Sequence, residues 1–271
     1  MPEKMITLYC FFDELLRAIG HKDDVQAKLS TAQVRTIAAV AAEFFTGNQQ
    51  AALDFLISHG YIAPFSKSRF NPRLHALPET LWQMALYVPA QVHQKTNPEH
   101  VHVVDTFPVP VCRNIRIKRC PIYRGKDFHG YCASKREYFY GLKVCLIVTE
   151  SGEPVEMLLV PGSTTDIAAL RSMDLNLPEN STLFGDTGFL DIAFETALRE
   201  EAGLDLVVPR RKDMRQQLDG CLEYVCRYSG KRVETSFSQL CERLARSIPA
   251  VTPRGFELKV FLTVLAFSII G

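Results

Sequence analysis

The hydrophobic period of this sequence changes near residue 100, and that change constrains the fold more than any other feature. Before it, apolar residues recur every three or four positions, from Leu8 to Ile19 and again from Val34 to Phe45, which predicts amphipathic helices. After it, β-branched and aromatic residues come in short runs bounded by Gly and Pro, which is typical of strands. We therefore expect an N-terminal helical domain over residues 1–95 and an α/β domain over residues 96–271.

The first domain should consist of several short helices. Ser30 or Thr31 can cap the second of them, and Gly47 can end it. A third helix is expected from Gln49 to Ser58. The prolines that follow are expected to interrupt any further helix: Pro64, Pro72, Pro78 and Pro89. This succession is compatible with a helix-turn-helix DNA-binding unit and equally with a plain helical bundle.

The second domain alternates strands and helices. Residues 101–104 indicate a strand with Asp105 at its end, and two runs joined by Ser151-Gly152 indicate a hairpin, residues 138–149 and 154–160. Further strands are expected at residues 182–184 and 204–208, and helices at residues 166–173, 192–202, 233–244 and 256–270. Residues 210–232 hold few apolar groups and should form an exposed loop. This order predicts a mixed sheet with helices on both faces.

A formal net charge of +1 conceals one strongly basic segment. We define the basic segment as residues 113–136. It carries eight cations against Asp127 alone: Arg113, Arg116, Lys118, Arg119, Arg124, Lys126, Lys135 and Arg136. Aromatic side chains interleave with them: Tyr123, Phe128, His129, Tyr131 and Tyr138. Cations bind phosphates and aromatic rings stack on bases, so the segment predicts DNA contact, with a solvated loop as the alternative. A second candidate patch is Arg210, Arg211, Lys212 and Arg215.

Three acidic residues stand out by position. Asp105 and Asp186 each follow a buried-looking strand, and Glu234 lies at the rim of a helix's apolar stripe. Taken singly, such residues usually cap loops or face solvent. Together they can form an all-oxygen cage of the kind that suits Mg²⁺ or Mn²⁺, a pair of which activates the attacking oxygen and stabilises the leaving one in phosphodiester cleavage.

Five ordered motifs carry a resemblance to a known family. They are VVDTFPVPVCR, Tyr140-Gly141-x-Lys143, Pro161-Gly162-Ser163-x-x-Asp166, FGDTGF and RVETSFSQL. The set resembles bacterial insertion-sequence transposases of the DDE type, and most closely insertion-sequence family 982. The resemblance implies an α/β fold, with a ribonuclease H-like mixed sheet flanked by helices and an N-terminal helical domain. It also implies a catalytic triad of Asp105, Asp186 and Glu234 that holds a pair of Mg²⁺ or Mn²⁺ ions.

This resemblance implies a function and partners. The chain would cleave strands at transposon ends and transfer them into target DNA, so its partner would be double-stranded DNA, with a homodimer or larger assembly forming on it. The phosphate backbone would be positioned by the following residues: Arg113, Arg116, Lys118, Arg119, Arg124, Lys126, Lys231 and Arg232. We expect a bacterial cytoplasmic protein, associated with the nucleoid when bound to DNA.

Two alternative functions stay open. One is a metal-dependent DNA nuclease that does not join strands. The other is a decayed DNA-binding remnant, suggested by Cys241 at a position where such families commonly carry Lys or Arg, and by the chain end at Gly271.

The cysteines and the apolar runs say less about function. The eight cysteines include no C-x-x-C pair, so free thiols in a reducing cytosol are expected, with a zinc site as the alternative. The N-terminus has no secretory signal pattern. The longest apolar run, Val260 to Ile270, is shorter than the roughly 20 residues of a membrane span, which predicts a buried helix and no membrane partner.

Overall fold

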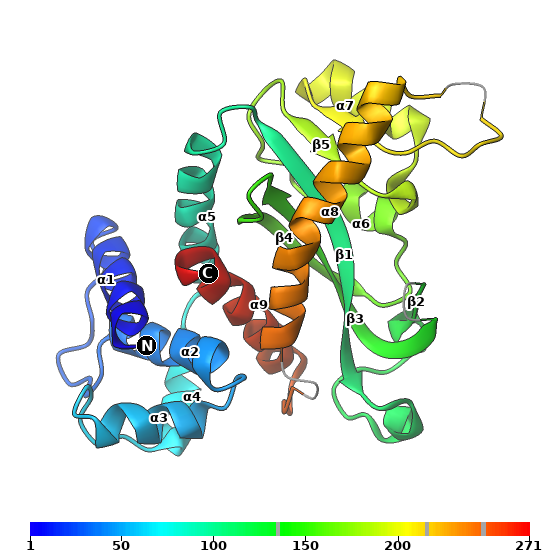
Figure 1. The fold of residues 1–271 in the computed structure, drawn as a ribbon. Helices are drawn as coiled ribbons and strands as arrows, with labels where there is room; N and C mark the ends of the chain where they lie inside the picture. The colour runs from blue at the N-terminus through cyan, green and yellow to red at the C-terminus, as the bar shows by residue number, and fades with distance from the viewer. Residues whose placement is uncertain (134–135, 215–216, 245–247) are drawn as a thin grey trace. The chain divides into compact units, whose positions relative to one another are not determined.

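The computed structural model describes residues 1–133, 136–214, 217–244 and 248–271. The chain divides into two compact units (Figure 1). We call the first the helical unit; it contains Met1–Pro89, Glu242–Ala250 and Arg254–Gly271. We call the second the sheet unit; it contains Ala90–Cys241 and Val251–Pro253.

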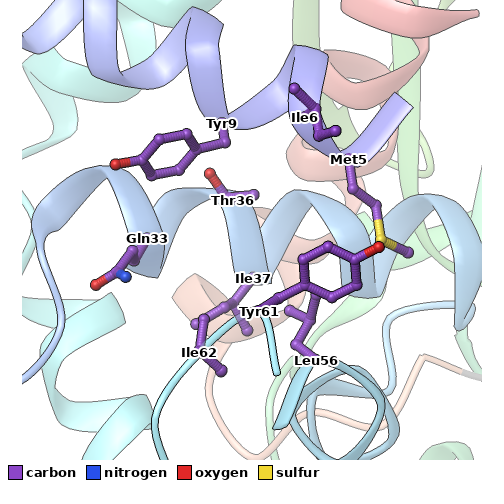
Figure 2. A pocket seen from close by; sticks show the side chains of 9 residues that line it. All are labelled: Met5, Ile6, Tyr9, Gln33, Thr36, Ile37, Leu56, Tyr61 and Ile62. Atoms are coloured by element: carbon purple, nitrogen blue, oxygen red, sulfur yellow. The ribbon is translucent and has the colours of Figure 1, made fainter. Parts of the chain in front are cut away.

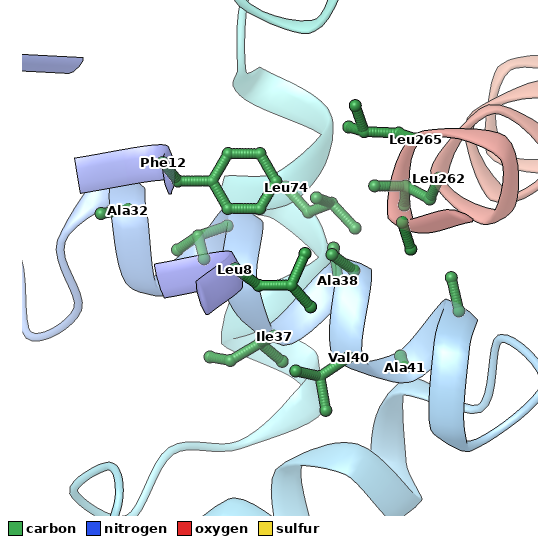
Figure 3. Packing of buried hydrophobic residues seen from close by; sticks show 14 of the residues in the cluster. Leu8, Phe12, Ala32, Ile37, Ala38, Val40, Ala41, Leu74, Leu262 and Leu265 are labelled. Atoms are coloured by element: carbon green, nitrogen blue, oxygen red, sulfur yellow. The ribbon is translucent and has the colours of Figure 1, made fainter. Parts of the chain in front are cut away.

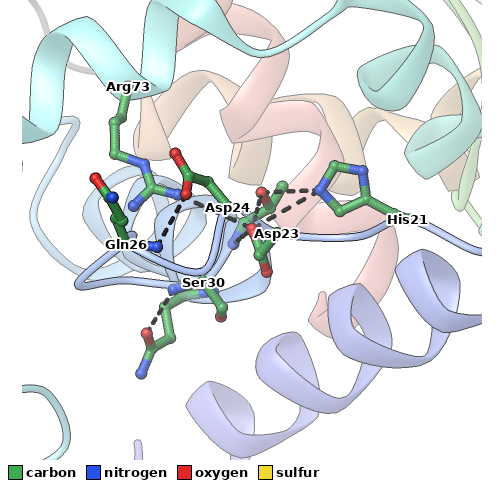
Figure 4. Close-up of polar contacts among 8 residues, drawn as sticks. His21, Asp23, Asp24, Gln26, Ser30 and Arg73 are labelled. Atoms are coloured by element: carbon green, nitrogen blue, oxygen red, sulfur yellow. Dashed lines mark hydrogen bonds and ion pairs between the residues drawn. The ribbon is translucent and has the colours of Figure 1, made fainter.

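The helical unit begins with three helices close to the expected ones, α1 (Pro2–Ala18), α2 (Thr31–Phe44) and α3 (Gln49–Ser58). Ser30 caps α2 as expected: its side chain accepts from the N–H of Gln33, whose own side chain accepts from the Ser30 N–H. The turn before α2 is held by Asp23, which accepts from the backbone N–H and the hydroxyl of Thr31 at 2.8 and 2.6 Å. Figure 4 shows Asp23 between His21 and Arg73.

Two of the four prolines do not interrupt a helix, so that prediction was wrong for them. Pro72 lies inside α4 (Lys67–Ala76) and Pro89 inside α5 (Glu79–Lys95). In α4, Phe70 and Leu74 on either side of the proline are almost fully buried, at 0% and 1% exposure. Burial of these side chains outweighs the hydrogen bond that a proline removes from the helix.

The core of the helical unit joins helices from both ends of the chain. Figure 3 shows Leu8 and Phe12 of α1 packed with α2, with α4, and with Leu262 and Leu265 of α9 (Pro253–Ile270). The expected division at residue 95 placed this last helix in the α/β domain. In the structure its residues from Arg254 on belong to the helical unit, because its apolar face is buried in that core.

The sheet unit contains six strands and three α-helices among the described residues. The strands are β1 (Val101–Cys112), β2 (His129–Cys132), β3 (Glu137–Thr149), β4 (Pro154–Pro161), β5 (Thr182–Phe184) and β6 (Asp205–Val207). The helices are α6 (Asp166–Arg171), α7 (Ile192–Ala202) and α8 (Gly220–Arg243), with short 3-10 turns η1 (Asn114–Arg119), η2 (Lys126–Phe128) and η3 (Thr187–Phe189).

The strand order confirms the predicted fold class. β1 pairs with β3 in antiparallel and with β5 in parallel orientation, β5 pairs with β6 in parallel, and β4 and β2 pair with successive stretches of β3 in antiparallel. The order β4-β3-β1-β5-β6, with a meander of three antiparallel strands followed by two parallel ones, is that of a ribonuclease H-like sheet. One apolar core of this unit packs β1, β3, β5 and β6 against α6 and α7.

β1 is longer than predicted, so Asp105 lies within the strand and not at its end. β5 pairs only with Val101–Val103, whereas β3 continues beside β1 as far as Cys112. Beyond Val103, β1 is therefore open on the β5 side. An edge of this kind tolerates Pro108 and Pro110, which lie in this part of the strand.

α8 also begins earlier than predicted. Residues 210–232 were expected to form a loop, but the helix starts at Gly220. Its first half is fixed to the sheet through Cys226, whose thiol contacts the carbonyl oxygens of Gly185 and Val207 at 3.6 Å each. A small thiol side chain therefore anchors a stretch of helix that has few apolar residues.

Two further expectations concern the whole chain. None of the eight cysteines, all of which lie in the described ranges, forms a disulfide, in agreement with the expected thiols. Within those ranges, no helix is both long enough and apolar enough to span a membrane.

Candidate active site

The register between β1 and β5 brings Asp105 and Asp186 together. The last parallel pair is Val103 with Phe184, and each aspartate follows two residues later on its own chain segment. Side chains two residues apart in a strand point to the same face. Asp105 and Asp186 therefore occupy matching positions at the point where the two strands part.

Backbone N–H groups hold both carboxylates. The Asp105 carboxylate accepts from the N–H of Thr106 at 2.6 Å. The Asp186 carboxylate caps η3 and accepts from the N–H of Gly188 at 2.8 Å. Gly185, before Asp186, lies so close to Val104 that an added Cβ would approach its side chain to 3.2 Å. The glycine beside the aspartate therefore favours close packing against β1.

Glu234 comes from α8, which crosses β1 in Figure 1. The helix is fixed on either side of the glutamate, by Cys226 beneath its first half and by an edge-to-face contact of Phe237 with Phe107 at 6.1 Å. Glu234 itself is exposed. Its charge nevertheless acts on Asp105 and raises the pKa of that carboxyl. The three predicted acids are therefore electrostatic neighbours, from three separate elements.

The electrostatics of the site are those of crowded anions. Burial is the main cause that raises the pKa of Asp105 to about 7, and the charges of Asp186, Asp166 and Glu234 raise it further, against the hydrogen bond from Thr106. Burial and Asp166 also raise the pKa of Asp186, while the Gly188 N–H and Lys143 oppose that shift. Each additional anion makes the next one costlier to ionise.

The donor set fits a hard divalent cation. Asp105, Asp186 and Glu234 offer only carboxylate oxygens, the ligands that Mg²⁺ and Mn²⁺ prefer, and a cation would relieve the repulsion that raises the pKa of Asp105. As the side chains lie, no three His, Cys, Asp or Glu residues in the described ranges converge closely enough to hold one ion. The same finding gives the alternative zinc site no support among those residues.

Sequence reasoning missed two residues of this site. Asp166, which was expected only to begin a helix, acts on both Asp105 and Asp186, and Lys143 forms an ion pair with it at 2.9 Å. The signal was present, since both residues belong to the motifs that carry the family resemblance.

The basic segment lies on η1, η2 and β2. Its predicted DNA-binding cations are all exposed: Arg113, Arg116, Lys118, Arg119, Arg124 and Lys126. Arg136 is exposed too, and Lys135 lies outside the described residues. Lys231 is exposed on α8; the backbone of Arg232 lies in the same helix, and its side chain is outside the described part.

The aromatic residues of the basic segment divide into two kinds. Tyr123 is 7% exposed and packs on Phe128 with ring centroids 4.7 Å apart. Its ring is therefore part of the packed interior of the segment and cannot stack on a base. Tyr131 and Tyr138 are 49% and 73% exposed and lie side by side at 4.9 Å. The expected stacking surface is therefore reduced to this exposed pair and His129.

The second basic patch is not a single surface. Arg210 forms a two-pronged ion pair with Glu195 at 2.5 and 2.6 Å, and both side chains are nearly buried. This arginine fastens the chain after β6 to α7 and is not available to a phosphate. Arg211 and Lys212 are exposed, and Arg215 lies outside the described residues.

The helical unit contains a hollow of a different character. Figure 2 shows its lining, from α1, α2 and the end of α3, with Met5, Tyr9 and Leu56 among the side chains. No charged residue lines it. It therefore lacks the cations that a phosphate site requires, and DNA binding by this unit stays a prediction.

We compared the chain with known protein families, curated proteins and solved structures. Residues 95–245 match the family model described as "Transposase DDE domain". A solved structure, "Mos1 transposase paired-end complex with left transposon end", is similar over 81% of each chain, at 12% identity and a TM-score of 0.26. Similarity that low does not itself establish a shared fold. No curated protein matches the sequence.

Proposed function

Because the chain belongs to the DDE transposase domain family, we propose that it is a DNA transposase that cleaves strands at transposon ends and transfers them into target DNA. The matched region contains Asp105, Asp186 and Glu234. The observation that carries the proposal is geometric: the parallel register of β1 and β5 brings Asp105 and Asp186 together, and α8, packed on β1 through Phe237 and Phe107, carries Glu234 near enough for its charge to act on Asp105. The motifs further favour membership of insertion-sequence family 982.

We assign these three acids to the binding of two Mg²⁺ or Mn²⁺ ions. When bound, such a pair activates the attacking oxygen and stabilises the leaving one in an in-line displacement. Asp105 would contribute to the binding of both ions, since the charges of both other acids act on it. The N–H groups of Thr106 and Gly188 orient the carboxylates of Asp105 and Asp186 before any ion or DNA arrives.

The cations would position the DNA backbone. The Arg and Lys side chains of the basic segment are exposed, which suits phosphate contact that is independent of base sequence. Lys231 and Arg232, beside Glu234, would hold phosphates near the scissile bond. The proposed partner is double-stranded DNA, both transposon ends and target, bound by a homodimer or larger assembly in the bacterial cytoplasm.

Products distinguish this function from its two alternatives. The full chain is incubated with Mg²⁺, a labelled duplex taken from the DNA flanking its gene, and a plasmid target. A transposase yields a 3′-hydroxyl at the element's end and a labelled strand joined covalently to the plasmid. Cleavage without joining would indicate a nuclease, and binding without either would indicate a remnant. Asp105→Asn is the matched control, because it keeps the shape of the side chain but not its charge.

A further inference from the structure

We propose that Lys143 and Asp166 are a positioning pair that sets the charge of the acidic site and thereby its affinity for divalent cations. The inference rests on the proposed function, because it assumes that Asp105 and Asp186 bind such cations.

Asp166 is held in place by two strands. One of its carboxylate oxygens accepts from the hydroxyl of Thr106 on β1 at 2.7 Å and from the ammonium of Lys143 on β3 at 2.9 Å. Lys143 also donates to the carbonyl of Thr164 at 2.9 Å, just before α6. The side chains of Lys143 and Asp166 are only 13% and 27% exposed. This fixed arrangement is unlike a solvated surface ion pair.

The second oxygen of Asp166 lies on the side of Gly188 and Asp186. A Cβ added to Gly188 would lie 2.7 Å from Asp166 Oδ2 and 2.9 Å from Asp186 Oδ1. Two carboxylates therefore approach one backbone position from different elements, and only a glycine leaves them room. Asp166 also acts on Asp105, next to the Thr106 that it binds.

The roles of the two residues follow from their charges. Asp166 adds an anion beside Asp105 and Asp186, which favours a bound cation. Lys143 is paired with that anion and offsets it, so that the site does not accumulate an uncompensated fourth negative charge. One Asp166 oxygen is engaged by Thr106 and Lys143, which suits a residue that acts through the field and geometry of the catalytic acids and not as a main ligand.

Because Asp166 and Lys143 carry opposite charges, their removal should change the cation affinity of the site in opposite directions, and direct measurement of cation binding tests this. Mn²⁺ is titrated into the full chain, and free Mn²⁺ is measured from its electron paramagnetic resonance spectrum. Asp166→Asn should weaken Mn²⁺ binding by about tenfold. This is the smallest loss of metal affinity that is typical when a residue supporting the metal ligands is replaced. Lys143→Met should tighten it by about threefold to tenfold, as expected for one charge acting on a divalent ion in a water-like medium.

Two further variants separate charge from architecture. The double variant Lys143→Met with Asp166→Asn removes one charge of each sign and should return the affinity to within about threefold of the original. Lys143→Arg keeps the charge and should leave the affinity nearly unchanged. A purely structural role predicts that Lys143→Met and the double variant both weaken binding, and that result would overturn the inference.

The control is Asp105→Asn, which should lose most Mn²⁺ binding. If it does, and the Lys143 and Asp166 variants leave affinity unmoved, only the further inference fails. If the unmodified chain binds no Mn²⁺, or Asp105→Asn binds it as well, both the proposed site and the inference fail.

Discussion

The acidic site and the basic segment each concentrate one sign of charge, and they differ in how the fold treats it. Asp105 on β1, Asp186 at the start of η3 and Asp166 at the start of α6 are each held by hydrogen bonds, and burial and neighbouring anions raise the pKa of Asp105 to about 7. The cations of the basic segment project from short 3-10 turns and are exposed.

This difference suits the acidic site to catalysis and the basic segment to DNA binding. Charges that the fold crowds and orients are poised to act on a reacting group, because their energies change when a cation or proton arrives. Charges that the fold leaves in solvent lose few contacts within the protein when they bind a phosphate. They therefore contribute to DNA affinity without orienting a reacting group. Substitutions in the two regions should therefore change different observables.

The largest effect is expected at the two aspartates. Asp105→Asn and Asp186→Asn should each lower the rate of end cleavage by at least about a thousandfold, equivalent to about 4 kcal/mol of transition-state stabilisation, because a neutral amide is a poor ligand for a hard cation. DNA affinity in a gel-shift assay should stay within about threefold, since the basic segment is untouched. Undiminished cleavage by either variant would remove that residue from the triad.

Glu234→Gln should have a smaller effect, a loss of about a hundredfold in Mg²⁺, corresponding to roughly 3 kcal/mol. Glu234 is exposed on α8, whereas backbone N–H groups orient the carboxylates of Asp105 and Asp186, so water can replace part of the role of Glu234. Mn²⁺, which is less demanding of its ligands, should restore part of the rate. Cleavage rates in the two metals measure this, with Gln239→Glu, on the exposed side of the same helix, as a matched variant that should change neither rate.

The basic segment should respond in binding and not in chemistry. Neutralising Arg116, Lys118, Arg119 and Arg124 together should reduce the slope of log K against log salt by about 3–4 units, roughly 0.9 for each phosphate that no longer has a cation beside it. The thermal midpoint should barely move, because these side chains are exposed. An unchanged slope would identify the segment as a solvated loop, and the DNA-binding surface would then have to be sought elsewhere.

The smallest effect concerns stability and pH. The pKa of Asp105 is raised by folding to about 7, so its proton stabilises the folded state fully at low pH and this contribution is lost as pH rises through 7. In metal-free buffer the free energy of unfolding should fall by about 1.4 kcal/mol between pH 6 and pH 8 on account of this group. Asp105→Asn should remove that part of the slope in urea titrations. Equal slopes for both proteins would contradict the assigned pKa.

The sequence predicted the elements whose periodicity is unbroken. α3, α7 and β5 have the expected bounds, and the hairpin of β3 and β4 follows from two apolar runs around one turn. Asp105 was placed at a strand end because the run of valines stops at Val104, and only the pairing with β3 shows that β1 continues to Cys112 as an open edge. Local sequence does not contain that fact.

The proposed site divides in the same way. The triad came from ordered motifs, whereas the roles of Asp166 and Lys143 depend on contacts between α6, β1 and β3 that no spacing expresses. Likewise, the sequence placed Arg210 in a candidate basic patch, whereas in the structure it forms an ion pair with Glu195. What a sequence cannot give is which of its many charges are neutralised by a partner far along the chain.

The central claim is that carboxylates from β1, the end of β5 and α8 form one divalent-cation site. Fe²⁺ with hydrogen peroxide and ascorbate tests it directly, because a bound Fe²⁺ reduces peroxide to a hydroxyl radical that cuts the nearby backbone, and ascorbate regenerates the Fe²⁺. We predict cuts close to Asp105, Asp186 and Glu234 in the same sample, suppressed by excess Mg²⁺ and absent in Asp105→Asn. Cuts confined to one of these positions, or unaffected by Mg²⁺ and by Asp105→Asn, would contradict a shared site.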